Sequence, residues 1–353
     1  MTAAKQSSML RLLRGRLLYV FLVVLVAGLY AGIMPVSVPR HHEITKVSPT
    51  EETLGWWPKE LDAHALQTAV AKEPALGLML SSVMVLLVGC GVGGILLLGW
   101  ALATGRFRAL WGQVSHRLPA WSFGELGRIL LLTMLVASLL PFLSAAWGTD
   151  PVSGALDHHL WVTVSMLCLD VFVILLVLAF ASEKGTTAWS ALGFSGFSPV
   201  AAGLRNYLMA FPWLFLLVAL TVKATQWFHW TPPVEPIQEL VFQEQRGAVL
   251  GLVLVLACVI GPVAEELFFR GVLYPAIRTR TSRLAATLLS GAAFSLVHTN
   301  VVGFLPIMAL GCLLAYLYES TGSLASPLAV HIVHNSLLMS LALVLRKLLF
   351  LAQ

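Results

Sequence analysis

Residues 264–271 read AEELFFRG and lie inside an apolar run that extends from about 247 to 276. A charged side chain at bilayer depth costs on the order of 2.5–3.5 kcal/mol, so the charges in this run need a reason. On a helix, Glu266 and Arg270 are four residues apart and can neutralise one another. Glu265 points about 100° away and has no basic partner at that spacing. The simpler alternative is a charged helix end whose side chains reach the membrane interface.

The composition of the whole chain indicates a membrane protein. Hydrophobic residues make up 58% of the sequence and charged residues 11%, with a mean hydropathy of +0.85. Because lipid offers the backbone no water, the apolar runs predict helices. We expect an all-α fold, a polytopic transmembrane helix bundle of about eight to nine spans. The expected spans lie near 17–35, 76–103, 129–148, 160–182, 206–224, 247–276, 284–299, 302–318 and 326–345.

The late helices are joined by short connections and form the densest block of the sequence. We expect N-terminal transmembrane helices over 1–205, with a partly helical outer polar loop at 39–74. The core that carries the motifs is expected over 206–353.

The net charge of +5 does not indicate nucleic-acid binding, because the basic residues flank helices. Arginines cluster at 11–16, 106–128 and 278–283, a pattern that places the N-terminus in the cytoplasm. Arg346 and Lys347 close the last span on the opposite side. The final helices are therefore expected to be short, tilted or re-entrant.

Two further polar groups interrupt the late apolar runs. Phe294 begins the sequence FSLVH, which ends at His298, and His331 begins HIVHN, which ends at Asn335. His331 and Asn335 are four residues apart and lie one above the other on a helix. With Glu265, these groups can supply a general base, proton shuttles and an oxyanion donor.

These residues resemble the motifs of the CPBP intramembrane proteases, which include type II CAAX prenyl endopeptidases and bacteriocin-processing enzymes. The family signature is EExxxR, then FxxxH, then HxxxN, and the resemblance covers about 250–345. The matching residues are Glu265, Glu266 and Arg270, then Phe294 and His298, then His331 and Asn335.

The resemblance implies an intramembrane endopeptidase acting on membrane-associated or lipid-anchored, CAAX-like substrates in a bacterial-type cytoplasmic membrane. It implies that Glu265 activates the attacking water with help from His298. His331 and Asn335 would stabilise the oxyanion, while Glu266 and Arg270 hold the helix.

Several alternatives remain open at this point. A zinc-dependent version would use Glu265, His298 and His331 as metal ligands, although a metal-free mechanism without a cofactor is favoured. A proton- or cation-coupled transporter would use the same groups as a relay. A non-catalytic immunity or scaffold protein would keep the motifs as structure. The expected partners are membrane lipid and a protein or peptide substrate, with no nucleic acid, and the oligomeric state is open.

Other motifs are assigned structural roles. Gly193–Gly196 spells the GxSG of rhomboid-type serine proteases, but Ser195 lies in a polar connection. Gly89, Gly91 and Gly94 form a GxGxxG string inside an apolar span, which predicts helix packing. Asp170 is expected to make a polar packing contact, because an aspartyl protease needs a second aspartate. The pairs His41–His42 and His158–His159 are expected in solvated loops. His334 is three residues from His331, and it could share that side of the helix or be a structural bystander.

Overall fold

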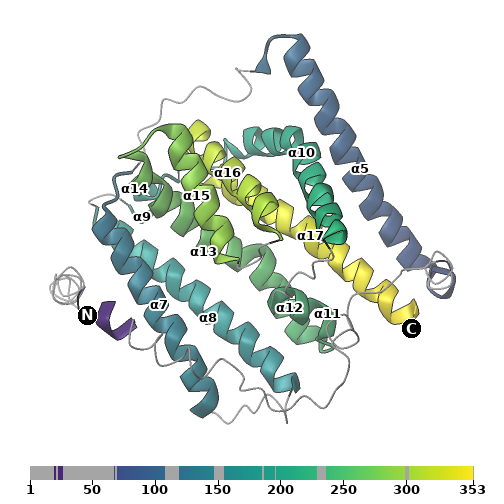
Figure 1. Ribbon diagram of the computed structural model, residues 1–353, viewed down its shortest axis with the longest axis horizontal. Helices are drawn as coiled ribbons and strands as arrows, with labels where there is room; N and C mark the ends of the chain where they lie inside the picture. Colours follow the sequence, from purple (N-terminus) through teal and green to yellow (C-terminus); the bar gives the residue numbers. More distant parts are fainter. Residues whose placement is uncertain are drawn as a thin grey trace.

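The computed structural model is helical in the parts of the chain that it describes, which are 20, 23–26, 67, 70–107, 119–146, 155–184, 187–194, 196–228, 236–298 and 302–352. The helices are α5 (Pro74–Ala103), α7 (Phe123–Ala146), α8 (Ala155–Ser182), α9 (Ala188–Ala191), α10 (Val200–Trp227), α11 (Pro236–Gln243), α12 (Gly247–Val255), η1 (Leu256–Ile260), α13 (Gly261–Phe268), η2 (Phe269–Leu273), α14 (Tyr274–Arg278), α15 (Arg283–Val297), α16 (Phe304–Thr321) and α17 (Ala325–Ala352) (Figure 1). The expected all-α fold is confirmed.

Within the described residues, seven helical segments are long and apolar enough to cross a membrane. They are Pro74–Ala103, Phe123–Leu140, His158–Ser182, Val200–Trp227, Gly247–Arg278, Phe304–Thr321 and Ala325–Leu348. The chain is an integral membrane protein. The expected span at 17–35 and the polar loop at 39–74 lie largely outside the described residues.

Helix α15 is a shorter apolar helix of 15 residues. At 1.5 Å per residue it is about 22 Å long, less than the roughly 30 Å of a bilayer's hydrocarbon core. Helices α15 and α16 form a hairpin in which two glycines allow close contact. A side chain at Gly311 would meet the backbone of Gly291. The end of α15, where His298 lies, is therefore expected within the membrane.

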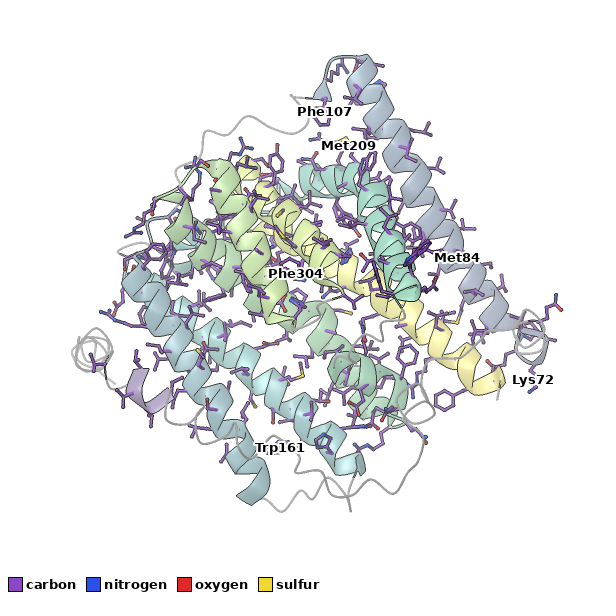
Figure 2. The ribbon with its side chains drawn as sticks, viewed as in Figure 1. Lys72, Met84, Phe107, Trp161, Met209 and Phe304 are labelled. Carbon is purple, nitrogen blue, oxygen red and sulfur yellow. The ribbon has the colours of Figure 1, made fainter. Side chains whose placement is uncertain are left out.

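Apolar side chains cover the outside of the bundle, as is usual for surfaces that face lipid. Helix α5 buries few of its side chains, and Met84 is among those exposed along it (Figure 2). It contacts α10 through Gly94, where a Cβ would collide with the carbonyl of Leu208. The expected packing role of the glycine string thus belongs to Gly94, because a Cβ added at Gly89 or Gly91 would meet nothing within 4 Å.

Gly247–Arg278 is one continuous helical segment with two π turns, η1 and η2. Each π turn comes just before a proline, Pro262 and Pro275. Proline lacks a backbone N–H, so it leaves a carbonyl in the preceding turn without its helical partner. At η1 the N–H of Gly261 reaches Leu256, five residues back. The wider turn alters the direction in which the following side chains point.

An ion cluster joins helix ends at the end of the bundle opposite Arg278. Arg246 binds the buried carboxylate of Glu244, and His159 from α8 lies 3.3 Å from it. Arg346 donates to the backbone carbonyl of Glu244, and Lys347 pairs with Glu73. The predicted loop position was wrong for both His158 and His159, which lie in α8; His158 is exposed as expected, whereas His159 is buried.

This cluster also explains the basic residues at the end of the last span. The positive charges of Arg346 and Lys347 are paired with oxygen acceptors on other segments. The two residues can therefore lie at the end of a long helix. Helix α17 has 28 residues and is long enough to cross the bilayer. The expectation of a short last helix was wrong because partner groups, and not the membrane interface alone, hold these charges.

Candidate active site

The three sequence motifs come together at the centre of the bundle. Helix α13 carries Glu265 and Glu266, and η2 carries Arg270. Helix α15 ends with Phe294 and His298, and α17 carries His331 and Asn335. Helices α13 and α17 pack against one another, as do α15 and α16.

Glu266 and Arg270 form a buried ion pair. Nη1 of Arg270 lies 2.8 Å from Oε1 of Glu266, with both side chains almost fully buried. Nη2 of Arg270 donates to the carbonyl of Gly311 on α16, at 3.0 Å. The arginine therefore neutralises Glu266 and links α13 to the α15–α16 hairpin. The supporting role of the pair in catalysis stays a prediction.

His331 lies between the two glutamates. Its Nδ1 is 2.9 Å from Oε1 of Glu266, and its Nε2 is 3.6 Å from Oε2 of Glu265. A carboxylate only accepts hydrogen bonds, so Nδ1 of His331 donates to Glu266. A neutral ring would then present the Nε2 lone pair to the oxygens of Glu265, which is repulsive. When Nε2 also carries a proton, His331 can donate to Glu265, and a proton can pass between the two groups.

Glu265 is the less constrained carboxylate. Its side chain is 31% exposed, whereas that of Glu266 is 2% exposed. One of its oxygens, Oε2, is buried without a hydrogen-bond partner. Glu265 thus combines a partly exposed side chain with an unsatisfied oxygen, which suits a group that binds and deprotonates water.

Phe294 forms a common wall for the site. Its ring centroid lies 4.8 Å from that of His298 and 5.6 Å from that of His331. The guanidinium of Arg270 lies 4.6 Å from the Phe294 ring, a cation–π distance. The phenylalanine therefore fixes the spacing of the two histidines and covers the buried arginine.

His298 caps the end of α15, and its hydrogen bond fixes its tautomer. Nδ1 is 2.8 Å from the carbonyl of Phe294. Because a carbonyl only accepts, Nδ1 carries the proton, and in the neutral ring Nε2 keeps a free lone pair. His298 can therefore accept a proton at Nε2, but it can stabilise an oxyanion only when protonated.

Asn335 is tied to the first π turn. Its Nδ2 donates to the carbonyl of Ala257 at 2.9 Å. Ala257 is five residues before Pro262, which has no N–H, and the N–H of Gly261 is already bonded to Leu256. Asn335 thus satisfies a carbonyl that the helix leaves unpaired, and its second amide hydrogen remains available for the expected oxyanion role.

His334 belongs to a separate contact. Its Nδ1 lies 2.9 Å from the hydroxyl of Tyr207 on α10, and the two rings meet edge to face. No motif on α10 had singled out Tyr207. The side chain of His334 is therefore engaged with α10, while that of His331 is engaged with the glutamates.

The residues do not fit the expected zinc alternative. Three protein ligands of zinc must lie within about 2.0–2.3 Å of a single point. Over the described ranges, no three His, Cys, Asp or Glu side chains are grouped to hold a metal ion. Glu265, His298 and His331 therefore do not form a metal centre in this arrangement.

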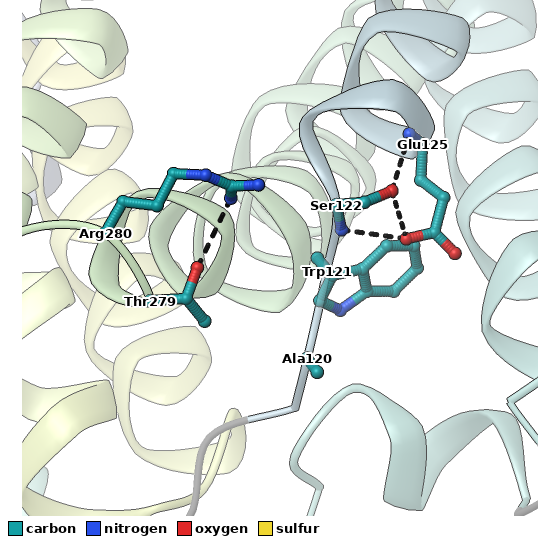
Figure 3. Close-up of a pocket in the computed structure, with 6 residues that line it drawn as sticks. All are labelled: Ala120, Trp121, Ser122, Glu125, Thr279 and Arg280. Carbon is teal, nitrogen blue, oxygen red and sulfur yellow. Dashed lines mark hydrogen bonds between the residues drawn. The ribbon is translucent and has the colours of Figure 1, made fainter.

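A separate hollow of about 510 Å³ lies between the start of α7 and the end of α14. Figure 3 shows Ser122 and Glu125 joined by hydrogen bonds on one side of it, and Arg280 with Thr279 on the other. None of the motif residues lines this hollow. Its position does not bear on the chemistry of the glutamates.

Comparison with known proteins identifies the region that holds this site. Residues 247–337 match the family described as "Type II CAAX prenyl endopeptidase Rce1-like". This matched stretch, the Rce1-like segment, is the part of the chain that is similar to the family. The chain is also 29% identical over 85 residues to the Bacillus subtilis (strain 168) protein named "Putative membrane peptidase YdiL". That match covers 24% of this chain and 35% of the relative's length. No solved structure matches the chain.

The Rce1-like segment contains every candidate residue of the site, from Glu265 to Asn335. Helix α8 lies outside this segment, yet it packs directly against α13. Sequence reasoning assigned Asp170 on α8 to packing alone. The Asp170 side chain lies beside Gly261, one helical turn before Glu265 on α13, a neighbourhood that spacing along one helix could not reveal.

Proposed function

We propose that this protein is an intramembrane endopeptidase in which Glu265 activates a water molecule for direct attack on a peptide carbonyl. The proposal rests on the different surroundings of the two glutamates. Glu266 is neutralised by Arg270, while Glu265 is partly exposed and faces His331. Only Glu265 is placed to take a proton without losing a buried ion pair.

The hydrolytic step needs one base and one proton donor. Glu265 removes a proton from water as the oxygen bonds to the substrate carbonyl carbon. The proton passes through Glu265 and His331 to the amide nitrogen as the carbon–nitrogen bond breaks. The second hydrogen of the Asn335 amide, and His298 when it is protonated, are the groups that would donate to the oxyanion.

The substrate class follows from the location of the site. Glu265 and His331 lie in candidate membrane spans, so the scissile bond must enter the bundle from the membrane or its surface. The Rce1-like match favours a lipid-anchored, CAAX-like peptide. A prenylated CAAX peptide should therefore be cleaved faster than the same peptide without its lipid.

The decisive experiment compares wild type, Glu265→Gln and His334→Gln in bilayer nanodiscs. Removal of a general base lowers kcat by about 10²–10⁴-fold, and this loss is expected for E265Q. The control H334Q alters a neighbouring histidine that faces Tyr207 and should keep the activity. Cleavage by folded E265Q at the wild-type rate would contradict the proposal. A chelator added to wild type should leave cleavage unchanged, and loss of cleavage would restore the zinc alternative.

We infer the orientation from the two ends of Gly247–Arg278. Arg278, Arg280 and Arg283 gather at one end and predict a cytoplasmic face. The cluster around Glu244 would then face outward, and the N-terminus would be cytoplasmic. Single cysteines at Thr281 and Glu239, labelled from outside intact cells after the native cysteines are removed, should react only at position 239.

A further inference from the structure

Ser295 lies between the two motif residues of α15, one residue after Phe294 and three before His298. Its side chain is 1% exposed, and neither the sequence motifs nor the proposed reaction gives it a role. A hydroxyl buried in apolar surroundings is costly unless it is hydrogen-bonded, so its partner indicates what it does. The partner of Ser295 is on another helix.

The hydroxyl of Ser295 joins the end of α15 to the start of α16. Its Oγ donates to the carbonyl of Phe304, the first residue of α16, at 2.7 Å. Between the two helices the chain has only residues 298–303. The bond therefore closes the α15–α16 hairpin at the end that carries His298.

The backbone of Ser295 holds His298 directly. The N–H of His298 donates to the carbonyl of Ser295 at 3.2 Å, three residues back, as in the tighter turns that often end α-helices. The carbonyl of Phe294, four residues back, instead pairs with the His298 ring, whose Nδ1 lies 2.8 Å from it. The direction of the His298 ring thus depends on the shape of the last turn of α15.

A second serine on the same helix shows what distinguishes Ser295. Ser290 is also fully buried on α15, yet its Oγ has no hydrogen-bond partner in the described part of the chain. A buried hydroxyl on this helix is therefore tolerated without a bond. The link to α16 is a property of Ser295 and not of every serine on α15.

We propose that Ser295 is a positioning residue of the active site, whose hydroxyl bond to Phe304 fixes the last turn of α15 and so the direction of the His298 ring. This inference rests on the proposed function, in which His298 acts beside Glu265. Without the bond, the end of α15 can move away from α16. His298 then shifts relative to the groups with which it must exchange protons.

The first test compares Ser295→Ala, Ser295→Cys and Ser290→Ala in the full-length protein in nanodiscs. S295A removes the hydroxyl, whereas S295C fills the space with a thiol that is a weak donor. A misplacement of about 1 Å can cost about 10²-fold in rate, so kcat should fall about tenfold or more in both, with KM within about twofold of wild type. S290A is the matched control and should show wild-type kinetics. Wild-type kcat in S295A or S295C would overturn the inference.

A double variant shows whether Ser295 acts through His298. In the His298→Gln background the imidazole is already absent, so adding S295A should change kcat by less than about twofold. A loss in this background as large as that in the wild-type background would mean that Ser295 supports the fold alone, and the inference would be wrong.

A further readout does not depend on activity. Diethyl pyrocarbonate modifies neutral imidazole rings, and peptide mass spectrometry can quantify its adduct on His298. Modification of His298 should be several-fold faster in S295A and S295C than in wild type and S290A. Equal rates in all four proteins would contradict the proposal. If wild type cleaves no peptide but S295A and S295C alter the modification rate, the proposed function fails while the effect of Ser295 on His298 stands.

Discussion

At the scale of single residues, the two histidines of the site differ in what they can do. His331 has both ring nitrogens directed at carboxylates, whereas His298 has one nitrogen committed to the carbonyl of Phe294. A neutral His298 is therefore an acceptor at Nε2. In the proposed reaction His298 can therefore accept a proton at Nε2 and, once protonated, donate to the oxyanion.

Replacing His298 with glutamine tests that assignment. Glutamine has a donor amide but cannot take up a proton, so kcat should fall about 10²-fold or more for H298Q. The folded fraction should be unchanged, because the hydrogen bond of His298 is made to the end of its own helix. Kinetics and size-exclusion profiles of H298Q and H334Q, measured side by side, check the prediction. Equal activity in the two variants would remove His298 from the mechanism.

Arg270 gives a prediction about stability. Removing one partner of a buried ion pair costs about 3–5 kcal/mol, since the other charge is left uncompensated. Arg270→Gln should therefore lower the free energy of unfolding by this amount, whereas the exposed Arg280→Gln should change it little. Denaturation of both variants in mixed micelles provides the measurement. A stable R270Q would show that Glu266 is neutralised in another way.

The residue scale also shows the limits of sequence reasoning. The spacing of Glu266 and Arg270 predicted their pairing, because both residues lie on one helix. The contacts of His331 with the glutamates, and the position of Asp170 beside Gly261, cross between helices. The spacing of residues along a single helix contains no information about which other helix packs against it.

At the scale of elements, the Asn335 side chain supplies a hydrogen bond that the first π turn lacks. Pro262 removes the N–H that the Ala257 carbonyl would otherwise use, and Asn335 supplies a replacement. The sequence indicated a helix over 247–276 and a four-residue spacing of His331 and Asn335. It did not indicate the π turn, because a proline can be accommodated by a kink, a bulge or a helix end.

A double-mutant cycle measures this dependence. In the wild-type background, Asn335→Ala leaves a buried carbonyl unsatisfied, at a cost of about 1–3 kcal/mol. Pro262→Ala restores an N–H near that carbonyl, so the cost of N335A should be smaller in the P262A background. Unfolding free energies of the four proteins give the coupling. Additive effects would mean that the amide of Asn335 does not compensate for Pro262.

At the scale of the whole molecule, the ion cluster around Glu244 ties together helix ends that are distant in sequence. The side chain and backbone N–H of Arg246 bind Glu244 and hold the pKa of that carboxyl at about 2, below its ordinary 4.5. A carboxyl with a depressed pKa in the folded state stabilises the fold above its ordinary pKa. That contribution is lost as the pH falls from about 4.5 towards about 2.

The consequence is a specific sensitivity to acid. Glu244→Gln should unfold more easily than wild type at pH 7, and the difference should shrink as the pH falls below about 4.5. Thermal unfolding of wild type and E244Q across this range tests the prediction. A difference that stays constant with pH would mean that the cluster contributes packing rather than charge pairing.

The hairpin of α15 and α16 has a consequence for the surrounding bilayer. Helix α15 is about 8 Å shorter than the hydrocarbon core, so lipid beside its end must thin or bend to avoid an exposed polar terminus. Because of this hydrophobic mismatch, the local thickness of the membrane should influence the proposed hydrolysis. Short acyl chains would bring headgroups and water nearer to His298, and long chains would keep them away.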